Sequence, residues 1–457
     1  MSEILIPINS TDHINDSSKE YSLYVGEQRA IPKAMDGLKS AQRKALFLMQ
    51  TKSNEIKTVS LSGETISKGL YVHGDGSMSD TISLLAAPYS NNLPWLHGIG
   101  TFGTKVNPKA FAAPRYTYVK RSKAAEEILY ADRDIIPMQE NYDGSTEEPL
   151  HFLPIIPTVL LNGVSGIAVG WSTEILPRAL DDLIRATSAA IEGKRFNFLA
   201  PNYEYIDCDV TKIDSNVWEF KGKVKIDNST TVTVKELPPD LSLERFKDKL
   251  IQLEDQKIIQ SFTDNSTDHI DLEVKFRRGD LQKKTVDDII KILKLTSRKT
   301  ERIVTVDWDN KSIRQFDSAE QLIKEFVEER FGFYVRRFEK LLEEDEYELR
   351  YWKALKICFD NGLPSDILKA KDKAAVIKRI QSLTKVYKLD DSQLNRIASL
   401  PTFNWAKDRY KIVQEKIKEL ELAIKRYKRL LGNHTEIREI FKQEVLGLKK
   451  IKFEVER

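Results

Sequence analysis

The chain has 457 residues, with 72 Lys and Arg against 69 Asp and Glu, so its formal net charge is only +3. At about 150 residues per domain this length fits roughly three domains, and a 41% hydrophobic and 31% charged composition predicts a soluble, well-cored protein and argues against disorder. No long apolar run predicts a membrane-spanning helix, and the first residues predict no secretory signal. The two cysteines, Cys208 and Cys358, exclude a disulfide framework and fit a reducing cytosol.

The first part of the chain, from residue 21 to about 131, reads as helices with short connections. Helices are predicted over 41–50, over 63–70, and after the turn at 73–76, which together form a helix-turn-helix pattern. That pattern also occurs in many enzyme cores. Residues 135–170 are rich in Pro and Gly and end in LLNGVSGIAVG, whose spacing does not match a dinucleotide-binding fingerprint.

Charge is distributed unevenly along this part. From Thr81 to Ala125 there is no acidic residue, but six basic ones occur: Lys105, Lys109, Arg115, Lys120, Arg121 and Lys123. Such a stretch attracts phosphates. A surface loop that happens to be basic explains its composition equally well.

Residues 200–310 show strand patterns. Apolar side chains alternate over 218–226 and again at 232–234, on either side of the turn 227–229, which predicts a hairpin. Similar runs at 269–276 and 303–308 indicate a separate α+β domain.

The last third is helical. Apolar residues recur every three or four positions from Tyr410 to Leu431, and a similar series runs from Phe331 to Leu355. These two segments predict an antiparallel coiled coil. Residues 360–402 between them would form a helical head at its far end, and dimerisation through that head is expected.

Most familiar catalytic arrangements are missing from the sequence. The six histidines are too dispersed for a metal cluster, and neither a Ser/His/Asp or Cys/His nucleophile pattern nor a Walker-type glycine loop is visible. Two pairs, Asp207 with Asp209 and Asp307 with Asp309, are able to bind Mg²⁺. Their positions at the ends of strand-like runs favour ordinary turn acids.

One constellation lies inside the acid-free stretch, the dipeptide Arg115-Tyr116. A phenol with a pKa of about 10 is a poor nucleophile at neutral pH. A neighbouring guanidinium would stabilise phenolate and the charge that develops on a phosphodiester. Attack by tyrosine would conserve the energy of a broken DNA linkage as a phosphotyrosine bond. Taken alone, however, an Arg-Tyr dipeptide is usually structural.

Six motifs in order resemble the breakage-reunion subunit of type IIA DNA topoisomerases. They are IPKAMDGLK at 31–39, YVHGD at 71–75, GTFG at 100–103, APRY at 113–116, NYDG at 141–144 and LNGVSGIAVG at 161–170. Their order and spacing are similar to the A subunits of gyrase and topoisomerase IV and to eukaryotic topoisomerase II. The resemblance covers nearly the whole chain, and the short length is most like phage members of the family, which implies a role in DNA replication.

The resemblance assigns roles to individual residues. Tyr116 matches the nucleophile that joins the DNA 5′ phosphate, and Arg115 matches the neighbouring transition-state stabiliser. Arg29 and His73 match residues near the scissile phosphate. Ile167 matches an apolar wedge that enters a base step and bends the DNA, although a buried core role is its alternative. Further DNA contacts are expected from Arg43, Lys44, Lys105, Lys120 and Arg121.

Some positions depart from the family. Tyr71 stands where bacterial members have a second histidine, and Gly76 replaces a drug-contacting serine, so quinolone sensitivity is not implied. The sequence shows no ATPase domain and no acidic metal-binding domain. A separate large subunit is therefore expected to supply ATP binding and Mg²⁺. The sequence also lacks the DNA-wrapping domain of gyrase, which implies relaxation and decatenation without active supercoiling.

The resulting expectation is a multidomain α+β protein of five segments. These are an N-terminal arm (1–20), a winged-helix DNA-cleavage domain (21–170), a tower-like α+β domain (171–317), a coiled-coil stalk with a dimerisation head (318–432) and a C-terminal return helix (433–457). The implied protein is a homodimeric part of an ATP-dependent type II topoisomerase that acts on double-stranded DNA in the cytoplasm, that of the host if phage-encoded. A non-catalytic DNA-binding scaffold of the same fold is the alternative, and a purely architectural coiled-coil dimer would leave the basic stretch and the wedge motif unexplained.

Overall fold

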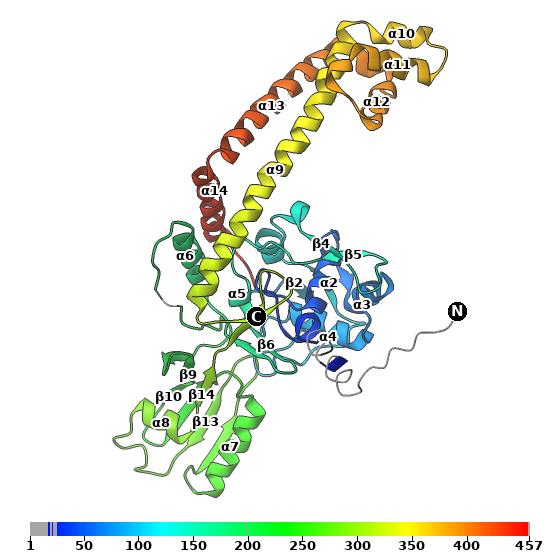
Figure 1. The fold of residues 1–457 in the computed structure, drawn as a ribbon. Coiled ribbons are helices and arrows are strands. Elements are labelled where there is room, and N and C mark those ends of the chain that lie inside the picture. The colour runs from blue at the N-terminus through cyan, green and yellow to red at the C-terminus, as the bar shows by residue number, and fades with distance from the viewer. Residues whose placement is uncertain (1–16, 19–20, 22–24, 198, 456–457) are drawn as a thin grey trace, which may run out of the picture. The chain divides into compact units, whose positions relative to one another are not determined.

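The computed structural model describes residues 17–18, 21, 25–197 and 199–455 (Figure 1). The predicted N-terminal arm, apart from residues 17 and 18, lies outside the described residues. The chain divides into two compact units, Met1–Arg330 with Lys442–Arg457, and Phe331–Phe441. No helix of the described part is long and apolar enough to cross a membrane.

The first unit begins with three helices that pack together, α2 (Ser40–Met49), α3 (Thr58–Ser67) and α4 (Asp75–Ala86). Their apolar faces are buried, including Leu46, Leu61 and Ile82. The predicted helix at 63–70 was misplaced, since α3 starts at Thr58 and ends before Gly69, whose φ of +70° ends the helical path. A small antiparallel sheet adjoins them, in the order β1 (Ile56–Lys57), β3 (Tyr118–Arg121), β2 (Leu96–Ile99).

Two further hairpins and two helices complete this region. The hairpins are β4 (Met138–Glu140) with β5 (Glu147–Pro149) and β6 (Val164–Ile167) with β7 (Ser172–Ile175), and the helices are α5 (Val159–Asn162) and α6 (Leu180–Ile191). Short helical turns are η1 (Gly26–Ala30), η2 (Ala125–Leu129) and η3 (Arg133–Ile135). A buried bidentate ion pair between Arg178 and Glu301 joins the end of β7 to a distant part of the chain, with both N–O distances at 2.7 Å.

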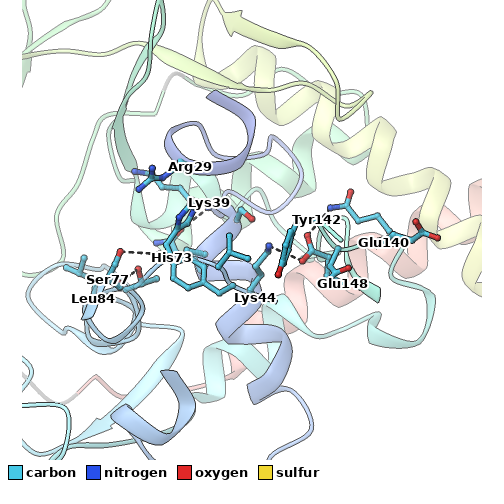
Figure 2. A pocket seen from close by; sticks show the side chains of 17 residues that line it. Arg29, Lys39, Lys44, His73, Ser77, Leu84, Glu140, Tyr142 and Glu148 are labelled. Carbon is cyan, nitrogen blue, oxygen red and sulfur yellow. Dashed lines mark hydrogen bonds and ion pairs between the residues drawn. The ribbon is translucent and has the colours of Figure 1, made fainter. Parts of the chain in front are cut away.

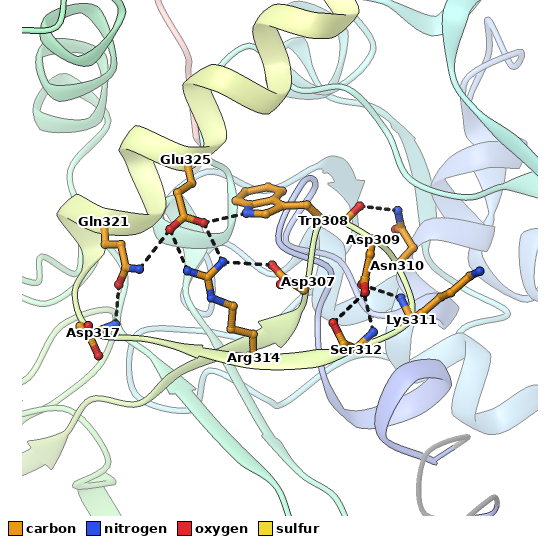
Figure 3. Close-up of polar contacts among 10 residues, drawn as sticks. All are labelled: Asp307, Trp308, Asp309, Asn310, Lys311, Ser312, Arg314, Asp317, Gln321 and Glu325. Atoms are coloured by element: carbon orange, nitrogen blue, oxygen red, sulfur yellow. Dashed lines mark hydrogen bonds and ion pairs between the residues drawn. The ribbon is translucent and has the colours of Figure 1, made fainter.

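The hairpin of β15 (Ile303–Val306) and β16 (Ile313–Phe316) is fastened to the first turns of α9 (Ala319–Asp360), as Figure 3 shows. Arg314 makes a bidentate pair with Glu325 at 2.8 Å, and the Trp308 indole donates to the same carboxylate at 3.0 Å. Asp309 accepts from the backbone of Lys311 and Ser312 inside the turn. Asp307 pairs with Arg314 at 3.6 Å, so both acids of this Asp-x-Asp pair interact with the protein itself.

The β-rich part of the first unit consists of two sheets and two helices (Figure 1). One sheet has the order β14 (Thr296–Thr300), β9 (Val217–Lys221), β8 (Asp209–Lys212). The other has the order β10 (Lys223–Ile226), β11 (Thr231–Glu236), β13 (Leu272–Lys275), β12 (Ser261–Asp264), and packs its core with α7 (Leu243–Asp255) and α8 (Val286–Ile292).

The predicted first strand of this part, 218–226, is divided between the two sheets at Gly222. β9 pairs with β14 and β8, whereas only β10 forms the expected hairpin with β11. A Cβ at Gly222 would lie 2.5 Å from the carbonyl oxygen of Glu236. Glycine therefore allows the close backbone approach at which the chain changes sheets.

The second unit is helical. The seam predicted from the sequence is buried, with Tyr334 and Leu355 on α9 and Val413 and Leu420 on α13 (Lys407–Leu431). The ion pairs Lys353–Glu421 (2.6 Å) and Lys428–Glu346 (2.7 Å) show that α13 runs antiparallel to α9. Shorter helices lie between them, and the chain then continues into α14. The helices between α9 and α13 are α10 (Leu363–Lys369), α11 (Lys373–Leu383), η4 (Lys385–Tyr387), α12 (Asp391–Ala398) and η5 (Thr402–Trp405). After α13 follow α14 (His434–Gly447) and η6 (Leu448–Lys450).

Candidate functional site

Tyr116 stands on a turn that points into solvent. It follows Pro114 and Arg115, precedes β3, and is 68% exposed although tyrosine is a large, mostly apolar side chain. The Arg115 guanidinium carbon lies 4.7 Å from the centre of the Tyr116 ring. At this distance the cation is attracted by the electron-rich face of the ring.

The turn that carries Tyr116 is hydrogen-bonded to the start of α3 both before and after the tyrosine. Thr58, the first residue of α3, donates its backbone N–H to the carbonyl of Thr117 at 3.0 Å, and the two hydroxyls lie 2.8 Å apart. The N–H of Val59 donates to the carbonyl of Pro114 at 3.2 Å. Thr117 is buried while its neighbour Tyr116 is exposed. The phenol therefore projects from a fixed backbone.

A cationic cavity of about 530 Å³ lies between η1, α2, α4 and the β4–β5 hairpin (Figure 2). Arg29, Lys39, Lys44 and His73 line it, together with Tyr142 and Glu148. Lys44 is paired with Glu148 at 3.0 Å, whereas Arg29 is exposed. The cavity thus offers a concentration of positive charge around an imidazole, which suits an anionic ligand such as a phosphate.

The surroundings of His73 favour the neutral form of its imidazole. Burial lowers the pKa of its imidazole below the ordinary value of 6.5, and the positive charges of Arg29 and Lys44 lower this pKa further. Burial likewise lowers the pKa of Lys39, whose ammonium donates to the carbonyl of Ser165 at 2.8 Å. A neutral imidazole at pH 7 is able to donate or accept one hydrogen bond at the cavity wall.

Arg43 was predicted to contact DNA, and the structure contradicts this. Its guanidinium is 5% exposed and is fully engaged by Asp36, at 2.7 and 3.0 Å, and by the carbonyl of Leu38 at 2.7 Å. Burial raises the pKa of Asp36, but the charge and hydrogen bonds of Arg43 outweigh burial and keep this pKa below its ordinary value. Arg43 therefore supports the backbone that leads into α2 from inside.

Asp36 connects Arg43 and the start of α2 to the segment that leads into α5. Its carboxylate accepts from the N–H of Phe152 at 2.9 Å and its carbonyl accepts from the Thr158 hydroxyl at 2.7 Å. The next residue, Gly37, has a φ of +65°, and a Cβ there would lie 2.5 Å from the backbone of Val159. The motif around Asp36 and Gly37 is thus explained by packing.

Ile167 lies at the tip of the β6–β7 hairpin with 85% of its side chain exposed. The alternative of a buried core residue is therefore wrong. Val169 and Trp171 in the same connection are 59% and 38% exposed. Beneath the tip, β6 is fixed by the hydrogen bond from Lys39 to Ser165 and by the close contact of Gly166 with the Ala30 carbonyl.

The three remaining predicted DNA contacts differ in their exposure to solvent and in their protein partners. Lys120 is exposed on β3. Arg121 is half-buried and is engaged by Glu126 at 2.5 Å and by the carbonyl of Gln50 at 2.9 Å. Lys105 contacts Glu236 at 2.7 Å and the carbonyl of Tyr205, so in this structure its ammonium is engaged by the β-rich part.

The cavity does not fit Mg²⁺. Glu148 is its most enclosed carboxylate and is already paired with Lys44 and accepts from Gln139. The other lining charges are mainly positive, and Mg²⁺ requires several oxygen ligands. In the part of the chain that the structure describes, no group of three or more His, Cys, Asp or Glu side chains is placed to hold a metal ion.

The structure thus brings Arg29, Lys44 and His73 together, while Tyr116 and Arg115 form a second group that does not line the same cavity. Sequence reasoning missed Lys39 and Tyr142, which line the cavity as well. Both lie inside motifs quoted for the family resemblance, at positions 39 and 142, and this location is the one signal that pointed to them.

Comparison with known proteins identifies the family and the fold of this chain. A sequence profile of the A subunits of DNA gyrase and topoisomerase IV matches residues 29–446. The DNA topoisomerase medium subunit of Enterobacteria phage T4 is 32% identical over 347 residues, covering 74% of this chain and 77% of that protein. DNA topoisomerase 2-alpha of Homo sapiens is 31% identical over 329 residues, or 69% of this chain, which spans 21% of the human protein.

Among solved structures, the Plasmodium falciparum topoisomerase II DNA-binding, cleavage and re-ligation domain has a TM-score of 0.82. Its sequence is 24% identical, and the match covers 96% of this chain and 66% of that one. This likeness shows that the two chains share a fold.

Proposed function

Because this chain belongs to the family of DNA gyrase and topoisomerase IV A subunits, we propose that Tyr116 is its DNA-cleaving nucleophile. The chain is a cleavage and religation subunit of a type II topoisomerase. The observation that supports the role of Tyr116 is its geometry, an exposed phenol on a fixed turn with a guanidinium stacked on its ring.

The proposed reaction is a reversible transesterification. The Tyr116 oxygen attacks the phosphorus, a bond from this oxygen to phosphorus forms, and the bond from phosphorus to the 3′ oxygen of the neighbouring nucleotide breaks. The phenolic proton leaves to water, to which Tyr116 is open, and the departing 3′ oxygen takes a proton from water and leaves as a hydroxyl. Attack of that hydroxyl on the phosphotyrosine restores the DNA, so no bond energy is lost.

The cationic cavity is proposed to bind the DNA backbone near the cut. Arg29 and Lys44 would contact phosphate oxygens, and neutral His73 would hydrogen-bond one of them. Lys120 would contact the backbone outside the cavity, and Arg121 would add positive charge beside it. Ile167 would enter a base step, where the cost of unstacking is offset by the larger surface that bent DNA presents.

Mg²⁺ and ATP are proposed to be held by a separate large subunit, since the cavity described here does not fit the metal. Two copies of this chain, joined through the head at 360–402, would cut both strands and pass a second duplex through the break. Relaxation and decatenation are the expected outcomes.

Cleavage by the complex of this chain with its large subunit tests the assignment. With Mg²⁺ and a denaturant quench, wild type should leave protein linked to DNA and Tyr116→Phe should not. Tyr118→Phe is the matched control, because Tyr118 is a second phenol, half-buried in β3. An adduct that survives Tyr116→Phe would assign the nucleophile elsewhere. If wild type binds DNA without forming an adduct, the chain is a DNA-binding scaffold.

A further inference from the structure

The loop that precedes Tyr116 reaches into the β-rich part of the same unit. At its tip the Lys105 ammonium donates to Glu236 at 2.7 Å and to the carbonyl of Tyr205. The Lys105 side chain is 17% exposed and the Glu236 side chain 9%. An ion pair this enclosed is screened little by salt, and loss of either partner leaves a buried charge.

Glu236 is itself fixed. It ends β11, and its carboxylate also accepts from the backbone N–H of Asp207 at 3.0 Å and of Leu237 at 3.1 Å. The residue after Lys105, Val106, packs against the apolar core of the β-rich part. The ion pair with Glu236 and the packing of Val106 therefore both join the tip of the loop to the β-rich part.

The loop is stiff between this tip and the nucleophile. The N–H of Thr104 donates to Asn107 at 3.0 Å, and that of Ala112 donates to Thr101 at 3.0 Å. Phe102 and Phe111 form an isolated β-bridge between these two hydrogen bonds. The base of the loop therefore closes directly onto the segment that carries Arg115 and Tyr116.

We propose that Lys105 is a positioning residue, whose ion pair with Glu236 fixes the loop before Tyr116 to the β-rich part and so sets where the phenol stands. This role rests on the proposed function of Tyr116. A displacement of the β-rich part, such as bent DNA would impose on it, is then transmitted along residues 102–111 to the nucleophile. Cleavage is sensitive to such shifts because about 1 Å of misplacement can cost ~100-fold in rate.

Two variants test the contact from its two sides. Lys105→Met removes the ammonium, and Glu236→Gln removes the carboxylate charge but keeps an oxygen for one of the two backbone donors. Lys109→Met is the control, since it removes the same charge from the same loop at an exposed position. Hydrogen–deuterium exchange of residues 102–116 is measured without DNA, and DNA binding and cleavage are measured in the complex with the large subunit.

The expected result is faster exchange in Lys105→Met and Glu236→Gln but not in Lys109→Met. Cleavage by the first two should fall about tenfold at unchanged DNA affinity. The double variant should lose less than the sum of the two single losses, because both single changes remove the same ion pair. Glu236→Gln preserves side-chain shape and an acceptor for one of the two backbone donors, so it carries the test if Lys105→Met does not fold.

Three results would overturn the proposal. If Lys105→Met weakens DNA binding and lowers its salt slope by about one while Glu236→Gln does not, Lys105 is a phosphate contact. Faster exchange with unchanged cleavage would show a contact without a positioning role. A wild-type complex that forms no adduct would refute the proposed function, whereas exchange would still report whether the ion pair holds the loop.

Discussion

Arg43 and Lys44 are adjacent in sequence but face different surroundings. Arg43 is enclosed with Asp36, whereas Lys44 lines the cationic cavity. Arg43→Met should lower the free energy of unfolding by about 3–5 kcal/mol, because it leaves a buried carboxylate without its cation. Urea unfolding measures this loss. Lys44→Met is the comparison for DNA affinity, since it should weaken DNA binding at low salt. It also leaves the carboxylate of Glu148 without its cation, so it should lower stability too. A weaker affinity of folded Arg43→Met for DNA would restore the original prediction.

His151 is a buried imidazole whose protonation makes the stability of the fold depend on pH. Burial lowers the pKa of its imidazole to about 4, although the charge of Asp36 acts in the opposite direction. Between this value and the ordinary pKa of 6.5 the unfolded chain binds a proton that the folded chain excludes. The contribution of His151 to the free energy of unfolding should therefore be fully present above pH 6.5, and about 2–3 kcal/mol should be lost on acidification to pH 4.5.

Unfolding of wild type and His151→Gln across pH 4.5–7 isolates this contribution. The wild-type curve should be steeper than that of the variant. His269→Gln is the control, because the His269 side chain is 68% exposed and its removal should leave the slope unchanged. Parallel curves for wild type and His151→Gln would show that the imidazole is accessible to protons in the folded chain.

At the scale of elements, regular helices were the easiest to predict. Val413, Ile417 and Leu420 recur at helical spacing because each is buried on one face of α13. The change of sheets at Gly222 left no local signal, since it depends on the carbonyl of Glu236 fourteen positions away. Periodicity reports which face is buried but not which distant backbone lies against it.

The candidate site shows the same limit. Tyr116 and His73 were found through motifs, whereas the burial of Arg43 and the engagement of Lys105 depend on partners from other segments. A basic side chain in a basic stretch resembles a phosphate contact until its acidic partner is located. The motifs thus singled out an exposed phenol and a cavity-lining imidazole, whereas the enclosure of Arg43 and Lys105 by acidic partners left no such signal in the sequence.

The β6–β7 hairpin is the element whose role is most directly testable. Ile167→Ala should reduce bending of bound DNA and lower cleavage about tenfold, because the smaller side chain separates a base step less. Fluorescence energy transfer between the ends of a short duplex measures the bend. Stability should change little, since 85% of the side chain is exposed.

Val169→Ala provides the matched control for this hairpin. Val169 follows Ile167 by two positions and is 59% exposed, so the change removes apolar surface beside the tip without altering Ile167 itself. Equal losses of bending in both variants would mean that the whole apolar tip contributes. Normal bending in Ile167→Ala would remove the wedge role from this residue.

At the scale of the whole molecule, the proposed double-strand cut requires that two copies of Tyr116 reach one duplex. The head, together with Phe403 directly after it, carries mostly exposed apolar side chains, since Leu368, Val386 and Phe403 are 85%, 86% and 66% exposed among the described residues. If they bury one another's surface between two copies, each contributes about 2 kcal/mol. The double variant Leu368→Asp with Phe403→Asp should then raise the dimer dissociation constant by at least about 100-fold.

Sedimentation equilibrium over a range of protein concentrations measures that constant. Leu422→Asp is the control, because Leu422 is 70% exposed on α13, outside the head, and the same change there should leave the dimer intact. With its large subunit, the monomeric double variant should still nick one strand through Tyr116 but should rarely cut both. If it sediments as a dimer, the two copies are joined elsewhere and the head has another role.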